Sequence, residues 1–148
     1  MLVSILSLAA SLVLAQAPPV NGACAVLTPA HVTALIGAPA QTLPMGYGPI
    51  GGSCMFQNDD KVITVLVATN AAADAAQRVF DAHKRIAAGT DIAGWGVPAY
   101  GASVKTFATA AVLKQLSFVE VKVSNATQKP EALAQALQAA MKEFAARK

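Results

Sequence analysis

Few side chains of this 148-residue chain are suited to acid–base or nucleophilic chemistry. There are two histidines, His31 and His83, and Asp81 precedes the second by two positions. A hydrolytic triad needs a nucleophile, a histidine and an acid that orients the histidine. Residues two apart on a helix point to different faces, and no serine, Ser53 included, lies in a nucleophile-elbow sequence. The sequence therefore predicts no catalytic residue and a protein that is not an enzyme.

Metal, nucleotide and nucleic-acid sites are not predicted either. Asp59-Asp60 is a turn signal before it is a metal site, and no set of three or four ligands shows zinc spacing. Residues 46–51 fit the G-x-G-x-x-G string, but Pro49 interrupts it and no helix is expected after it. The formal net charge is +3, and the eleven Lys and Arg residues are scattered rather than clustered. We therefore expect no cofactor, no metal and no nucleic-acid partner.

Three aromatic residues form the remaining candidate site. The five phenylalanines fall in or beside expected helices and strands, whereas the single tryptophan and both tyrosines fall in two glycine-rich segments: Tyr47, Trp95 and Tyr100. Amphipathic aromatic side chains on such loops offer contact area at low entropy cost. Two interpretations stay open. These residues form a rim that binds a ligand or a partner, or Trp95 and Tyr100 close the open end of a sheet.

The first residues of the chain predict export. A charge-free apolar run, Leu2 to Leu14, is followed by small residues and is too short for a membrane span of roughly 20 residues. We expect residues 1–15 to be a signal peptide cleaved after Ala15; Ala17 is the alternative, although Pro18 would hinder cleavage there. No Lys or Arg precedes the run, so either the amino terminus supplies the positive charge or the true start lies upstream. Residues 16–23 form a lead-in, and the mature protein is expected to be periplasmic or extracellular without a membrane span.

Cys24 and Cys54 are the only cysteines. In an oxidising compartment they are expected to form a disulfide, which would close a loop of about 30 residues and contribute about 3–4 kcal/mol in the chain-entropy model. Two buried free thiols are the alternative. Asn21 stands where a lipoprotein box has an aliphatic residue, so a lipid anchor on Cys24 is not expected.

Residues 24–148 have the size and composition of one domain. The chain is 55% hydrophobic and 13% charged, which argues against disorder. Thr28 and Pro29 predict a helix start and Gly37 predicts its end. The segments expected next are a Gly/Pro-rich loop (38–53), a strand (54–57), a turn (58–60) and a β-branched strand (61–68).

A second helix, a second strand pair and a last helix are expected next. Asn70 is expected to cap a helix over 71–88, with one face made by Ala75, Ala76, Val79, His83 and Ile86. A glycine-rich loop (91–101) and a strand pair (104–114 and 117–124) follow. In the second strand Val119, Val121 and Val123 alternate with Glu120 and Lys122, which predicts one solvated face. Pro130 begins a last helix that buries Leu133, Leu137, Met141 and Phe144. The predicted fold is α+β, an antiparallel sheet with packed helices in the order α-β-β-α-β-β-α and one disulfide.

Several short motifs resemble a bacterial exported and lipoprotein domain of unknown function. The similar segments are Cys24-Ala25-Val26-Leu27-Thr28-Pro29, Leu35-Ile36-Gly37, Cys54-Met55-Phe56 and Gly94-Trp95-Gly96-Val97-Pro98-Ala99-Tyr100. The chain departs from that family at Val97, where the family tends to have Asp. The resemblance implies a PsbP-like α/β sandwich and an exported location, and it implies no reaction.

Three functions follow as expectations. The first is a non-enzymatic exported domain that binds a small apolar ligand or a protein partner through the loops of Tyr47, Trp95 and Tyr100. The second is an envelope-associated structural or accessory protein without a small ligand. The third, a hydrolase, ranks below both because no nucleophile accompanies the histidines.

Overall fold

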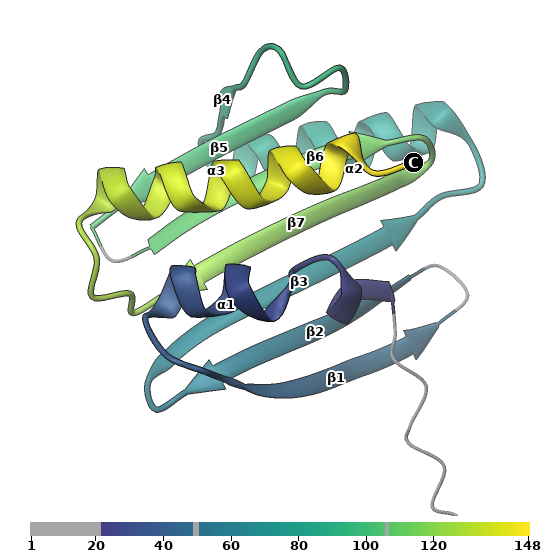
Figure 1. Cartoon of the computed structure of the whole chain (residues 1–148). Coiled ribbons are helices and arrows are strands. Elements are labelled where there is room, and N and C mark those ends of the chain that lie inside the picture. Colours follow the sequence, from purple (N-terminus) through teal and green to yellow (C-terminus); the bar gives the residue numbers. More distant parts are fainter. Residues whose placement is uncertain (1–21, 49–50, 106) are drawn as a thin grey trace, which may run out of the picture.

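The chain folds around a single antiparallel sheet with helices on both faces (Figure 1). The computed structural model describes residues 22–48, 51–105 and 107–148. The seven strands have the spatial order β1-β2-β3-β7-β6-β5-β4. They are β1 (Gln41–Gly48), β2 (Gly51–Asn58), β3 (Lys61–Thr69), β4 (Thr90–Asp91), β5 (Ala99–Val104), β6 (Phe107–Lys114) and β7 (Ser117–Ser124). The predicted α+β class is confirmed; the expected signal peptide (1–15) lies outside the described residues.

Helices divide the molecule into three layers. A short 3₁₀ helix, η1 (Gly22–Ala25), lies with α1 (Pro29–Ile36) and α3 (Pro130–Ala146) on one face of the sheet, and α2 (Ala73–Ile86) lies on the other (Figure 1). The face under α1 and α3 carries the larger core, with the alternate residues Val119, Val121 and Val123 of β7 fully or almost fully buried. A smaller core under α2 is built around Phe80, Tyr100 and Phe118.

Local sequence signals set the first helix as predicted. The Thr28 hydroxyl accepts the His31 backbone N–H at 3.2 Å, and the Thr28 N–H donates to His31 Nδ1 at 3.3 Å. This reciprocal capping box satisfies two amide groups that the helix start would leave unpaired. Gly37 ends α1 with a left-handed φ of 75°, a conformation that glycine adopts without steric cost. Pro130 likewise begins α3, as expected.

The expected cap of the second helix is wrong. Ala72 is the N-cap of α2, without a side-chain hydrogen bond. The Asn70 side chain instead donates to the carbonyl oxygen of Ala68 at 3.2 Å. Ile86, expected on the buried face, is 82% exposed. Its position is out of phase with the buried stripe of α2, which runs through Ala76 and Phe80 at four-residue spacing.

Both glycine-rich segments contain strands that the sequence did not predict. Within the expected loop 38–53 lies β1, which pairs along β2 with a register shift between Met45 and Tyr47. Within and around the expected loop 91–101 lie β4 and the start of β5. The expected strand 104–114 is in fact the end of β5 followed by β6. Three additional strands therefore extend the predicted sheet.

The solvated face predicted for the strand 117–124 is also wrong at its centre. Glu120 is 2% exposed, because α2 and the aromatic residues below it cover this part of the sheet. Alternation along β7 separates the valines from Glu120 as predicted, but the second face is a core of its own.

Candidate functional site

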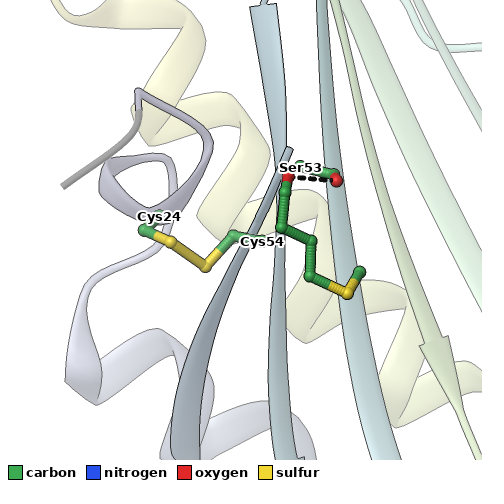
Figure 2. The surroundings of a disulfide bond; sticks show 4 residues. Cys24, Ser53 and Cys54 are labelled. Atoms are coloured by element: carbon green, nitrogen blue, oxygen red, sulfur yellow. Dashed lines mark hydrogen bonds between the residues drawn. A yellow bond between two sulfur atoms is a disulfide. The ribbon is translucent and has the colours of Figure 1, made fainter. Parts of the chain in front are cut away.

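A disulfide anchors the first candidate site. Cys24 of η1 bonds to Cys54 of β2, with the two Cα atoms 5.1 Å apart (Figure 2). The bond confirms the predicted pairing and fixes η1 against the sheet. Ser53, the next residue along β2, donates its hydroxyl to the carbonyl oxygen of Met45 in β1 at 2.6 Å (Figure 2). A structural disulfide is typical of an oxidising, non-cytoplasmic environment.

Beside this disulfide lies a cavity of about 300 Å³ between α1 and β1. Its floor consists of Cys24, Leu27, Val32 and Phe56, all at most 9% exposed. The floor is therefore apolar and includes one residue of the disulfide, Cys24. We call this space the α1–β1 cavity.

The rim of the α1–β1 cavity is more exposed than its floor. Pro29 and Thr33 come from α1, Pro39 and Ala40 from the connection to β1, and Thr42 from β1 itself. Thr33 and Thr42 are both exposed. In the described part of the chain neither threonine hydroxyl has a hydrogen-bond partner, so each can still donate and accept.

Several contacts hold the rim in place. The Asn58 side-chain amide donates to the Pro39 carbonyl oxygen at 2.7 Å, across the end of the β2–β3 hairpin. On the opposite side of α1, His31 Nε2 lies 3.0 Å from Glu143 Oε2 on α3. Because His31 Nδ1 accepts the Thr28 N–H, Nε2 carries the proton of the neutral ring and donates to Glu143. The cavity is therefore formed between elements that are already fixed by caps, hydrogen bonds and a disulfide.

The lining chemistry decides what the α1–β1 cavity can do. Every lining residue is uncharged, and the polar groups of its side chains are the threonine hydroxyls at the rim. Such a lining offers no group with the basicity needed for general acid–base catalysis at neutral pH. It suits binding by apolar contact, since ligand pockets are mostly apolar with a few polar groups that fix orientation.

A second candidate site contains the residues with the strongest chemical character. Glu120 on β7 accepts the Tyr100 phenol at 2.6 Å, lies 3.3 Å from His83 Nδ1 and lies 3.0 Å from Lys122 Nζ. We call these four residues the Glu120 cluster. They come from α2, β5 and β7, and meet beneath α2.

Two members of the Glu120 cluster, Tyr100 and Glu120, are buried, whereas the side chains of His83 and Lys122 are 31% and 41% exposed. Tyr100 is fully buried, and the Phe80 ring meets its ring edge-on with centroids 5.2 Å apart. The centroids of the His83 and Phe118 rings lie 4.6 Å apart. Burial, together with the hydrogen bond to the nearby Glu120 carboxylate, raises the pKa of Tyr100 far above its usual range. The carboxylate is therefore satisfied by its own neighbours, and the phenol stays a hydrogen-bond donor.

The predicted aromatic site is not assembled as one surface. Trp95, flanked by Gly94 and Gly96 with left-handed φ values of 82° and 74°, is half-buried against the α1/α3 core. Tyr100 is buried in the α2 core, on the opposite face of the sheet. Tyr47 lies in β1 opposite Gly52, and its side chain is outside the described residues. Neither Trp95 nor Tyr100 lines the α1–β1 cavity.

Sequence reasoning missed the cavity residues as a site. Thr28-Pro29 and Val32 were informative as helix signals, and Phe56 as a strand filler, but nothing in their types separates a cavity floor from an ordinary core. The sequence feature that could have indicated the cavity is Pro39-Ala40, a segment of small side chains that follows the helix and lines the cavity.

Within the described residues, no group of three or more His, Cys, Asp and Glu side chains is arranged to hold a metal ion. Among the helices of that same part, none has both the length and the apolar character that a bilayer crossing needs.

Comparison with protein-family models, with curated proteins and with solved structures found no significant match to this chain.

Proposed function

We propose that the mature protein is an exported, non-enzymatic domain that binds a small apolar ligand in the α1–β1 cavity. The observation that carries the proposal is the combination of an apolar, buried floor with an exposed rim in a space of about 300 Å³. That volume lies at the lower end of the range for small-molecule sites, roughly 300–1,000 Å³.

Export is supported by two independent features. The apolar run Leu2–Leu14 has the length of a signal-peptide core, and the Cys24–Cys54 disulfide needs an oxidising compartment to persist. Mass spectrometry of protein from the exported fraction should give a mature chain that begins near Gln16 and carries no lipid on Cys24. A diacylated Cys24, or a chain retained inside the cell with free thiols, would contradict the export part of the proposal.

The binding part is tested with butylbenzene, an apolar probe without a polar group. Titration followed by NMR should show saturable binding to the oxidised protein. Thr42→Trp places an indole at the rim and should abolish binding. Gln41→Trp is the matched control, because neighbouring residues of a strand point to opposite faces of the sheet. Both positions are exposed in β1, so neither change disturbs the core.

The outcomes separate the proposed function from its rivals. Binding that Thr42→Trp removes and Gln41→Trp retains supports the α1–β1 cavity as the site. Absence of saturable binding, or equal loss in both variants, would contradict it and would leave the envelope-associated accessory role as the better hypothesis.

A further inference from the structure

We infer that the ligand of the α1–β1 cavity is an uncharged molecule with a compact hydrocarbon body and a single hydroxyl or carbonyl group. The inference rests on the proposed function and adds the chemical class of the ligand. Three features of the cavity carry it: the absence of charge in its lining, its size, and the place of its two hydroxyl groups.

Charge is the first discriminating feature. No Asp, Glu, Lys, Arg or His is among the residues that line the cavity. On α1 itself, His31 Nε2 lies 3.0 Å from Glu143, whose other carboxylate oxygen lies 3.5 Å from the Arg147 guanidinium, so these charged groups are already paired. An ionised group placed over the apolar floor would lose hydration without gaining a counter-charge, which is strongly unfavourable. The cavity therefore selects against carboxylates, phosphates and ammonium groups.

Size is the second feature. At the packing density of a protein interior, a cavity of about 300 Å³ holds roughly 10 to 15 non-hydrogen atoms. An α-helix, about 10 Å across with its side chains, does not fit such a space. The space therefore excludes a partner helix and suits a small molecule or the end of one.

The third feature is the position of the polar groups. Thr33 and Thr42 stand on different elements of the rim, α1 and β1, above a floor of Leu27, Val32 and Phe56. Each hydroxyl is one donor and one acceptor that the described protein does not use. A ligand with its hydrocarbon body on the floor therefore meets a hydrogen-bonding group only at the mouth, where one hydroxyl or carbonyl suffices.

The experiment compares four probes that share one hydrocarbon body: butylbenzene, phenylbutanol, phenylbutanoate and phenylbutylammonium. Titration calorimetry of the oxidised protein should give the tightest binding for phenylbutanol, with a dissociation constant on the order of 10–100 µM. The carboxylate and the ammonium compound should bind at least about tenfold more weakly, because neither finds a counter-charge.

A double variant, Thr33→Val with Thr42→Val, tests the hydroxyl groups without changing the shape of the rim. It should weaken phenylbutanol about fivefold, the usual net worth of one hydrogen bond, and leave butylbenzene unchanged. Both threonines are exposed, so the variant should fold as the parent does.

The possible results distinguish an error in the ligand class from an error in the proposed function. Phenylbutanoate or phenylbutylammonium binding as tightly as phenylbutanol would overturn the ligand class while leaving the cavity as a binding site. Equal loss of phenylbutanol and butylbenzene in the double variant would also overturn the role of the hydroxyl groups. Failure of all four probes to bind would overturn the proposed function itself.

Discussion

The candidate sites on the two faces of the sheet differ in chemistry and in exposure. On the α2 face, the buried carboxylate of Glu120 is contacted by a phenol, an imidazole and an ammonium group. On the α1 face, the α1–β1 cavity has an apolar floor beside a disulfide. The threonine hydroxyl groups of its rim have no hydrogen-bond partner within the described chain. The Glu120 cluster is polar and has a buried carboxylate, whereas the α1–β1 cavity is apolar and has an exposed rim.

This difference shows that the side chains with the strongest chemical character are not those most accessible to a ligand. The Glu120 cluster contains the side chains that sequence reasoning associates with catalysis, yet its carboxylate and phenol are buried and already paired with each other, and His83 packs on Phe118. Buried polar networks of this kind position elements and make the packing of a helix specific. The α1–β1 cavity contains none of those side chains, but a ligand can reach it. The binding function that we propose therefore lies on the face with the simpler chemistry.

The largest effect is expected from removing the disulfide, which belongs to the α1 face alone. Cys24→Ser with Cys54→Ser should lower the free energy of unfolding by about 3–4 kcal/mol, because the bond closes a loop between residues 30 apart. It should also abolish butylbenzene binding, since η1 is no longer fixed beside the cavity floor. Urea denaturation measures the first and NMR titration the second. The parent protein under reductant is the control and should behave alike; a variant as stable as the parent would contradict the account.

Trp95 sharpens the comparison because it was a candidate for the binding surface. Its indole is half-buried against the α1/α3 core but does not line the cavity. Trp95→Ala should therefore lower the free energy of unfolding by about 2 kcal/mol and leave butylbenzene affinity unchanged. Ile86→Ala, at a residue 82% exposed, is the control and should change neither. Unchanged stability with lost binding would restore Trp95 to the site.

On the α2 face, Tyr100→Phe removes one hydrogen bond to a buried carboxylate and should cost about 2 kcal/mol at neutral pH. The native fold raises the pKa of Tyr100, so its contribution is complete below the unfolded value near 10 and is lost as the pH rises above it. The difference in unfolding free energy between parent and variant should therefore narrow above about pH 10. A difference that stays constant through that range would contradict the role assigned to the Tyr100–Glu120 hydrogen bond. Altered probe binding would show that the α2 face affects the α1–β1 cavity.

The smallest effect is expected at the solvent side of α2. Arg78 donates to Asp74 at 2.6 Å, and this contact lowers the pKa of the Asp74 carboxyl, but both side chains are exposed. Exposed pairs are screened by water and salt and contribute little. Asp74→Asn should leave thermal stability at pH 7 and probe binding unchanged within error. A clear loss of stability would mean that α2 depends on its surface charges rather than on the cluster beneath it.

Local rules predicted the parts of this fold that depend on local physics. Thr28, Pro29 and Gly37 fixed the limits of α1, because capping involves only neighbouring residues. The disulfide followed from the presence of two cysteines in a chain whose first residues predict export. The α+β class followed from the alternation of helical and strand signals.

The remaining features depend on neighbours distant in sequence. Pro44 and Gly46 are residue types that strands usually lack, so the sequence does not predict β1. This segment is a strand because it pairs with β2, and it lies at the edge of the sheet, where proline is tolerated. Glu120 has the pattern of a solvated residue and is buried only because α2 crosses above it. The cavity arises between α1, η1 and β1, and its residues have the types of any core. Trp95 and Tyr100, which share one glycine-rich segment of the sequence, lie on opposite faces of the sheet.

The most direct test of the central claim is a map of intermolecular NOEs between bound phenylbutanol and the protein methyl groups. The account predicts contacts from the phenyl ring to Leu27 and Val32, with the hydroxyl end nearest Thr42. Contacts to Leu66 or Leu113, beside the α2 core, or to the Trp95 indole would contradict it.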